Sequence, residues 1–364
     1  MLALSWLLAL IAPTAGATPA SRLPQDPIAI KVDRIVAPDG ATTAGGWIVV
    51  RGDRLEAVGA ATAPPGARTL EFPSGVACAG LVDAVTSLGA AGDLEEPARA
   101  FTPQVQAADA LHPDHSRFLA AARGGVTTVG LSPTSGNVVG GRVAIVRTHG
   151  VQGVAVLSGA GPMRLALTRD PFTSDRVPTS RVGALPRLRE LMQGDALAGR
   201  SPLVVDVDSA DEVRLAIETL GGSGRTVALL QPQRADDALE SVRGSDALAL
   251  LGPFDLDTPE RDLLQPQVLA GAGVPVGFTA DGDAAALRLT AALAARAGLD
   301  PKLALQALTV VPARALGVEG DSGSLEAGKR ADLVVFGGDP LDLASAVELV
   351  LVGGAVVEPR EKQR

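Results

Sequence analysis

Residues 203–230 read LVVDVDSADEVRLAIETLGGSGRTVALL, and two patterns alternate along them. The run Leu203–Val207 is short and apolar, residues 211–220 have the apolar spacing of a helix, and Thr226–Leu230 is again short and apolar. Two buried strands that are joined by a helix lie parallel to each other in one sheet. This stretch therefore predicts a strand–helix–strand unit.

The same alternation continues on both sides of this unit. Further strands are expected at 126–129, 247–251 and 275–278, and another helix at 235–242. Alternation over about 250 residues is typical of a closed (β/α)8 barrel. An open doubly wound sheet is the alternative, but no Gly-x-Gly-x-x-Gly motif follows the first strand. We therefore expect an α/β fold in which residues 77–328 form a TIM-like barrel.

Both ends of the chain have the pattern of short antiparallel strands instead. Residues 28–76 contain several β-like runs, and Gly52-Asp53 between two of them is a hairpin signal. Residues 331–336 and 347–357 are strand-like as well. Because neither set alone can bury its apolar face, we expect residues 21–76 and 329–364 to form one small composite β-sandwich.

The composition limits the classes of function. With 46% hydrophobic and 20% charged residues among 364, the chain can bury a large core, which excludes disorder as its main state. The net charge of −9 argues against a nucleic-acid-binding surface, which needs a dense basic patch. Aromatic residues make up only 2% and tyrosine does not occur, so platforms for base stacking are not expected either.

The first twenty residues resemble an export signal. Leu2–Ile11 is apolar but short for a membrane span, and Ala15-Gly16-Ala17 fits the small-x-small rule for cleavage. We expect residues 1–20 to be a signal peptide, with an uncleaved membrane anchor as the alternative. No later stretch is long and apolar enough for a second span, so the expected location is periplasmic or secreted.

Cysteine and histidine are scarce. The single cysteine, Cys78, excludes an intramolecular disulfide and a multi-cysteine metal cluster, and we expect it to be a small buried residue. The three histidines are His112, His115 and His149. We expect His112 and His115 to lie on the surface before a helix, outside the barrel mouth, so that neither is a metal ligand.

Several segments resemble a known family. Residues 304–317 (ALQALTVVPARALG) and 323–336 (GSLEAGKRADLVVF) resemble the closing segment of metal-dependent amidohydrolases, and residues 45–59 resemble the opening strands of that family. Residues 124–129 and 135–141 further resemble its imidazolonepropionase-like branch. The resemblance implies a (β/α)8 barrel with a sandwich from both chain ends. It also implies a hydrolase that acts on non-peptide or dipeptide C–N bonds and uses Zn²⁺.

The residues at the family's metal positions differ from the expected ligands. The resemblance places the His-x-His pair of the first strand at Val85 and Ser87, where an apolar side chain cannot bind a cation and a neutral hydroxyl is a weak ligand. The further positions fall at Asp206 and Gln231 for two histidines and near Arg164 for the metal-bridging lysine. The permanent positive charge of Arg164 repels a metal ion. Zinc is therefore expected from the family, but its ligands are missing from the sequence.

Asp281 keeps the residue type that the family has on its last strand, where it accepts the proton of a metal-bound water. It is the one catalytic candidate, although an isolated aspartate is a weak base. A carboxylate bonded to local backbone is the alternative. A further possibility is an oxygen-only site for Mg²⁺ or Ca²⁺ formed by Asp206, Asp208, Asp281 and Asp283, as opposed to a solvated acidic rim.

The loop after the second barrel strand is the candidate for substrate binding. Asn137 could contact a ligand, and the Gly140-Gly141 pair lets the backbone approach one closely. A purely structural turn is the alternative. Two hypotheses for function follow: an exported hydrolase with an altered or metal-free site, and a non-catalytic binding or assembly module (a pseudoenzyme). A small-molecule ligand and a homo-oligomer are the expected partners.

Overall fold

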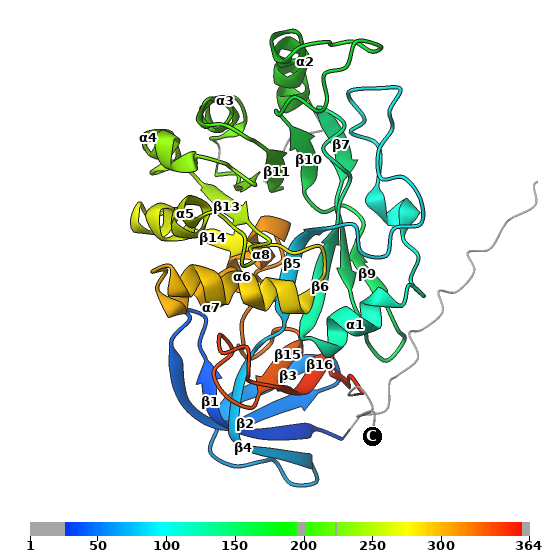
Figure 1. The fold of residues 1–364 in the computed structure, drawn as a ribbon. Coiled ribbons are helices and arrows are strands. Elements are labelled where there is room, and N and C mark those ends of the chain that lie inside the picture. Colours follow the sequence, from blue (N-terminus) through cyan, green and yellow to red (C-terminus); the bar gives the residue numbers. More distant parts are fainter. Residues whose placement is uncertain (1–25, 195–200, 223, 359–364) are drawn as a thin grey trace, which may run out of the picture.

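The computed structural model describes residues 26–194, 201–222 and 224–358. The expected signal peptide, residues 1–20, lies outside these ranges. In Figure 1 a curved sheet forms the lower part of the molecule, and a region of alternating strands and helices forms the upper part. No helix in the described ranges is both long and apolar enough to cross a membrane.

The lower sheet contains strands from both ends of the chain. Its order is β17-β16-β15-β4-β1-β2-β3. The strands are β1 (Ile28–Val36), β2 (Thr42–Arg51), β3 (Arg54–Ala60), β4 (Arg68–Ala79), β15 (Leu333–Phe336), β16 (Val347–Val352) and β17 (Ala355–Val356). The long strand β4 carries β1 on one edge, in parallel, and β15 on the other, antiparallel. β4 therefore joins the two ends of the chain.

This sheet has a hydrophobic core of its own, to which both ends contribute. Ile30, Ile48 and Val50 from the N-terminal strands pack with Leu333 and Leu351, and all five are buried. We expected a sandwich, in which two sheets pack face to face. The described strands instead form one continuous hydrogen-bonded sheet, because β4 pairs with a strand from each end.

The strands of the upper region form two sheets. Their orders are β14-β13-β12-β11-β10-β7 and β5-β6-β8-β9. The strands are β5 (Leu81–Thr86), β6 (Val126–Leu131), β7 (Val139–Arg142), β8 (Ala144–Arg147), β9 (Ala155–Ser158), β10 (Met163–Ala166), β11 (Leu203–Asp206), β12 (Val227–Leu230), β13 (Ala247–Leu251) and β14 (Val276–Phe278). The strands from β10 to β14 are parallel, as expected, and so are β5 and β6.

The two sheets meet at β7 and β8, which are separated only by Val143. β7 pairs antiparallel with β10, and β8 pairs antiparallel with β6. The described strands therefore do not form the expected closed ring of eight parallel strands. Between β14 and β5, side-chain hydrogen bonds take the place of a backbone ladder, and these are described below.

Most of the helices lie along the outer side of the parallel strands (Figure 1). The helices are α1 (Arg117–Arg123), α2 (Arg181–Gln193), α3 (Ala210–Leu220), α4 (Leu239–Val242), α5 (Glu260–Gly271), α6 (Ala284–Arg296), α7 (Pro301–Ala307) and α8 (Val310–Leu316), with the 3-10 turns η1 (Ala107–Ala110) and η2 (Ala235–Ala238). In α3, the Ser209 side chain caps the first turn, and the buried residues Val213, Ala216 and Leu220 have helical spacing. The predicted unit at residues 203–230 is confirmed.

Removal of residues 331–364 is expected to give insoluble protein. The truncation deletes β15, β16 and β17, so one edge of β4 loses its partner and Ile48 and Val50 lose part of their core. An unpaired apolar edge strand invites aggregation. The measurement is the soluble yield of the truncated chain, with a chain that ends at Glu358 as the control, since it keeps every strand of the sheet. A soluble truncation with cooperative unfolding would contradict this prediction.

Candidate functional site

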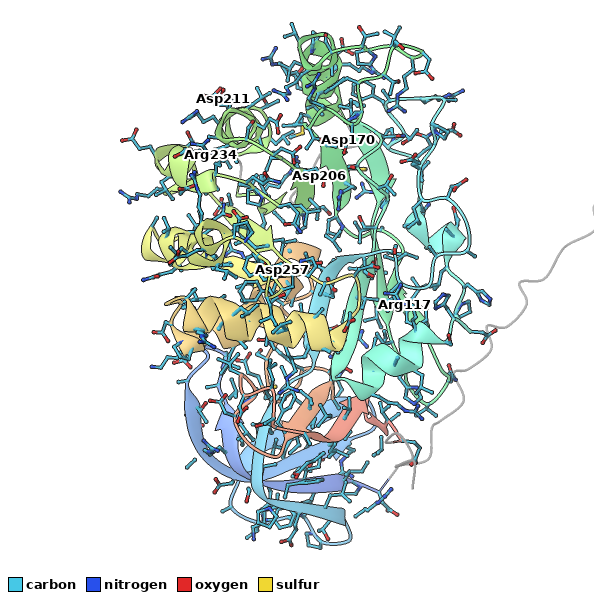
Figure 2. All side chains as sticks on the ribbon, in the orientation of Figure 1. Arg117, Asp170, Asp206, Asp211, Arg234 and Asp257 are labelled. Atoms are coloured by element: carbon cyan, nitrogen blue, oxygen red, sulfur yellow. The ribbon has the colours of Figure 1, made fainter. Side chains whose placement is uncertain are left out.

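The candidate site lies where the upper strands reach their carboxyl ends, the face on which barrels carry their active sites. β5, β10, β11, β12 and β14 bring the sequence-predicted positions to this face, which we call the mouth. These positions are Val85, Ser87, Arg164, Asp206, Gln231 and Asp281. Figure 2 shows Asp170 and Asp206 where β10 and β11 end.

Arg164 and Asp206 form a bidentate ion pair at the mouth. Arg164 Nε donates to Asp206 Oδ2 and Nη2 donates to Oδ1, each over 2.7 Å. Both residues are buried, and Arg164 Nη1 also donates to the Ser132 hydroxyl over 3.3 Å. Burial raises the pKa of Asp206, and the guanidinium opposes this rise. Both carboxylate oxygens of Asp206 are therefore taken up by Arg164, where the family resemblance placed a metal ligand and a metal-bridging lysine.

Asp281 is held by the end of β5. Its Oδ1 accepts hydrogen bonds from the backbone N–H of Ser87 (2.6 Å), the Ser87 hydroxyl (2.9 Å) and the Thr86 hydroxyl (2.9 Å). Arg117 Nη2 lies 3.3 Å from Oδ2 and donates to the Asp281 carbonyl over 2.7 Å. The hydroxyl of Ser87, where the family resemblance places the second histidine of the His-x-His pair, therefore binds this carboxylate.

These contacts decide the protonation of Asp281. Burial alone would raise the pKa of its carboxyl, but the hydrogen bonds from Ser87 and Thr86 and the charge of Arg117 outweigh it, so the pKa is lowered. A carboxylate that is stabilised in its ionised form is a poor proton acceptor. The geometry thus supports a structural role for Asp281 more than the role of a general base.

Asp83 is a further mouth residue, which sequence reasoning did not single out. It is fully buried on β5, and its Oδ2 accepts from the backbone N–H of Ala280 (3.0 Å) and of Gly282 (2.7 Å). These bonds connect the ends of β5 and β14 and support the turn in which Asp281 has a φ of 49°. The signal in the sequence is an acidic residue inside the apolar run Leu81–Ala84.

The second oxygen of Asp83 faces the Thr279 hydroxyl. Thr279 Oγ1 lies 2.5 Å from Asp83 Oδ1 and 2.8 Å from the Val85 carbonyl, but it has only one proton to donate. Burial raises the pKa of Asp83, against the effect of its hydrogen bonds. A proton on Asp83 Oδ1 would satisfy both contacts, since a carbonyl oxygen can only accept.

The four aspartates of the possible Mg²⁺ or Ca²⁺ site do not form one oxygen cluster. Asp206 is paired with Arg164 and Asp281 with β5, while Asp283 caps α6 by accepting from two backbone N–H groups. Asp208 has a raised pKa because of burial and the nearby carboxylate of Glu212. Within the described ranges no group of three or more His, Cys, Asp or Glu side chains could hold a metal ion. The geometry of the described residues therefore does not support the possible oxygen-only site.

The remaining candidate ligand position, Gln231, also has a partner within the protein. It follows β12 with a φ of 52°, and its side-chain amide donates to the carbonyl of Gly252. Val85 is half-buried at the mouth and packs against the apolar cluster inside the barrel. The donor set at the mouth therefore does not fit a zinc ion.

The side chain of Asn137 forms hydrogen bonds with a neighbouring segment of the protein. It is buried, and its Nδ2 donates to the carbonyl of Arg99 (2.9 Å), the carbonyl of Glu96 (3.1 Å) and the Thr102 hydroxyl (3.1 Å). Its amide thus holds the segment 96–102. This geometry supports the structural alternative at Asn137.

The glycine pair gives space to the backbone of a neighbouring loop. Gly141 has a φ of 117°, and a Cβ there would lie 2.5 Å from the carbonyl oxygen of Val105. At Gly140 the nearest atom, from Pro133, would lie 3.2 Å from such a Cβ. The close approach of the Val105 backbone therefore explains the glycine at position 141, and no ligand is needed for this explanation.

The histidines and the cysteine do not add to the mouth. His112 and His115 precede α1, as predicted, and His115 Nδ1 accepts from the backbone N–H of Arg117 over 3.3 Å. The pKa of His149 is lowered by burial and by the neighbouring charges of Arg123 and Arg147. Cys78 is buried, which raises its pKa to about 12. A thiol with this pKa is not a nucleophile at neutral pH.

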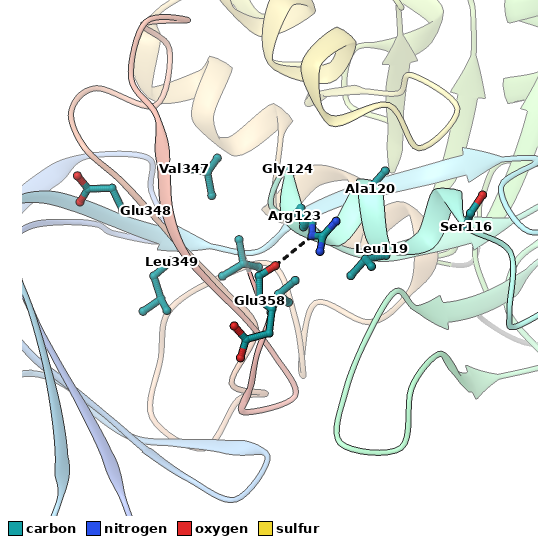
Figure 3. Close-up of a pocket in the computed structure, with 11 residues that line it drawn as sticks. Ser116, Leu119, Ala120, Arg123, Gly124, Val347, Glu348, Leu349 and Glu358 are labelled. Carbon is teal, nitrogen blue, oxygen red and sulfur yellow. Dashed lines mark hydrogen bonds between the residues drawn. The ribbon is translucent and has the colours of Figure 1, made fainter. Parts of the chain in front are cut away.

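A cavity of about 710 Å³ lies away from the mouth, between α1 and β16 (Figure 3). Leu119 and Arg123 from α1 line it together with Leu349 and the C-terminal residues Val357 and Glu358. Arg123 Nε donates to the Glu358 carbonyl over 3.0 Å, which connects α1 to the segment that follows β17.

Comparisons with known proteins agree with the fold. The family model described as "Amidohydrolase family" matches residues 255–358. Among solved structures, an amidohydrolase from Thermotoga maritima MSB8 is similar with a TM-score of 0.77 and 24% identity, over 92% of this chain and 100% of that one. Phenylurea hydrolase B is similar with a TM-score of 0.60 and 18% identity, over 92% and 97% of the two chains. No curated protein matches.

A Xaa-Pro dipeptidase with bound methionine is also similar, with a TM-score of 0.59 and 15% identity over 91% of this chain and 99% of that one. At these identities the structural likenesses concern the fold alone. They give the chain a barrel-type α/β domain with a sheet domain.

Replacement of Arg164 by methionine is expected to destabilise the protein by about 3–5 kcal/mol, because Asp206 is left buried without its cation. The double variant Arg164→Met/Asp206→Leu should recover most of this loss. The measurement is urea unfolding at pH 7. Arg187→Met is the matched control: the Arg187–Glu190 pair is exposed, so its loss should cost less than about 1 kcal/mol. If Arg164→Met loses no more stability than the control variant, the ion pair is not important for stability.

Replacement of Asp83 by asparagine is expected to change the free energy of unfolding by less than about 1 kcal/mol. The amide can donate to Thr279 and accept from the backbone at Ala280 and Gly282, as a protonated carboxyl does. Asp83→Leu should cost about 1–3 kcal/mol for each buried donor left without a partner. Urea unfolding of both variants at pH 7 distinguishes a protonated Asp83 from an ionised one. If the two variants lose equal stability, Asp83 is ionised in the native protein.

Proposed function

We propose that the chain is a member of the amidohydrolase superfamily that has lost metal-dependent hydrolysis and acts as a non-catalytic binding or assembly module. The observation that carries this proposal is the pairing of residues at the mouth. Asp206 is bonded to Arg164, and Asp281 is bonded to Ser87 and Thr86. The positions at which the family resemblance places metal-binding groups thus bind one another.

The chemistry of the donor set supports the proposal. Metal-assisted hydrolysis needs a cation that lowers the pKa of a bound water and polarises the scissile carbonyl. Binding of that cation here would require Asp206 to leave Arg164, while the guanidinium stayed within the same buried space. An unpaired buried charge is costly, so the ion pair opposes metal binding. Neither Val85 nor Gln231 offers a ligand that would offset this cost.

The second candidate function is a hydrolase with an altered site, which acts on a non-peptide or dipeptide C–N bond. One observation favours it: the side chain of Asp281 is 53% exposed, and among the described residues its Oδ2 has a polar contact with one side chain, that of Arg117. This oxygen could accept a proton from a water or a substrate. The lowered pKa of Asp281 argues against strong base catalysis, which is why we place this function second.

The location and the partners belong to the same proposal. The pattern of residues 1–20 supports export to the periplasm or secretion, and we propose a small-molecule ligand or a second copy of this chain as the partner. The net charge of −9 and the low aromatic content support a partner other than nucleic acid.

The proposal is tested by metal analysis and an activity screen of the purified full-length protein. Zinc is expected well below one ion per chain after purification without a chelator, and no turnover is expected with hydantoins, lactams or dipeptides. Asp281→Asn serves as the control for any turnover found. About one tightly bound zinc per chain at the mouth would contradict the proposal. So would turnover that falls about 100-fold or more in Asp281→Asn, since that loss is typical of a deleted general base.

A further inference from the structure

Asp332 lies at the junction between the lower sheet and the upper region. It directly precedes β15, and its backbone carbonyl accepts from the N–H of Gly80, the residue between β4 and β5 (2.9 Å). Its Oδ1 accepts from the N–H of Gly353, in the turn between β16 and β17, over 2.6 Å. Asp332 is 4% exposed, and its Oδ2 is buried with no hydrogen-bond partner among the described residues.

Arg147 reaches the same junction from the upper region. It ends β8, and a Cβ added at Gly353 would collide with its guanidinium. The guanidinium therefore lies directly over the turn that binds Asp332. Arg147 Nε is also buried and has no hydrogen-bond partner among the described residues. Each side of the junction thus contributes one ionisable side chain with an unsatisfied polar atom.

We propose that Asp332 and Arg147 make this junction pH-dependent, so that it is tight while Asp332 is protonated and loosens when Asp332 becomes charged. A buried carboxylate oxygen without a partner is costly, and more so when it is charged. Loosening admits water to the Oδ2 atom of Asp332 and the Nε atom of Arg147. This inference concerns the junction and does not depend on the proposed function of the mouth.

The charges around Asp332 set the pH range. Burial raises the pKa of Asp332 to about 6, although the N–H of Gly353, Arg147 and Arg330 all act to lower it. Asp53, in the turn between β2 and β3, acts in the opposite direction. Arg147 also acts on His149: burial and the charges of Arg123 and Arg147 lower the pKa of His149. His149 thus loses its proton at a lower pH than an unperturbed histidine does.

The direction in which pH changes the stability follows from the pKa of Asp332 in the folded and the unfolded state. Asp332 has a pKa of about 6 in the folded protein and 3.8 as the reference value for an unperturbed carboxyl. The folded state therefore binds the proton more tightly, and the stability that this provides is fully present below the unfolded pKa. It is lost as the pH rises through the folded pKa, so it is gone above about pH 6.

The test is urea unfolding of the full-length protein between pH 4 and 8, compared with Asp332→Asn. The asparagine keeps an acceptor for Gly353 and cannot ionise. The two proteins should have similar stability near pH 4. Above pH 6 the unfolding equilibrium constant of the wild type should be about 100-fold larger than that of the variant, which corresponds to about two pKa units. Equal pH profiles, or a variant that is weaker at every pH, would overturn the proposal.

Arg147→Met provides the matched comparison. Removal of this cation should weaken the protein above pH 6 when Asp332 is present, but much less in the Asp332→Asn background. Amide exchange reports the junction directly: the N–H groups of Gly80 and Gly353 should exchange faster at pH 7.5 than at pH 5, relative to their intrinsic rates, only when Asp332 is present. An equal effect of Arg147→Met in both backgrounds would overturn the coupling. If Asp332→Asn fails to fold, the pH profile of Arg147→Met alone decides the case.

Discussion

The guanidinium of Arg164 and the carboxylate of Asp206 are buried side by side, and neither charge could stay there without the other. β10 and β11 carry them on paired parallel strands, where Arg164 lies opposite Val204 and Asp206 lies opposite Ala166, so the ion pair connects the two strands at the mouth. It also determines the chemistry of that place. A site that already holds a cation and has used both carboxylate oxygens offers no ligand to a metal ion.

At the opposite side of the mouth, acidic side chains again connect the ends of two strands. β5 and β14 have no backbone ladder between them in the described sheets, and the buried carboxyl of Asp83 connects them instead. Asp281, on the turn that Asp83 supports, binds back to Ser87 at the end of β5. Acidic side chains thus hold the ends of β5 and β14 together.

Sequence reasoning located the strands of the parallel sheet well, because short buried runs such as residues 227–230 alternate with capped amphipathic helices. It did not anticipate the antiparallel strands β7 and β8, since Val139–Arg142 is short and contains two glycines. It placed Arg164 and Asp206 at the mouth but could not show that they bind each other. Asp83 was missed because its partners at residues 279–282 lie nearly 200 positions away in the chain. The expected imidazolonepropionase-like branch and the domain boundaries stay predictions.

A crystal structure of the full-length protein grown with excess Zn²⁺, with anomalous data collected at the zinc edge, tests the central claim most directly. The account predicts that Arg164 and Asp206 keep their bidentate contact and that no anomalous peak lies within bonding distance of Asp206, Asp281 or Gln231. A peak at full occupancy between these residues, with Arg164 turned away, would contradict it.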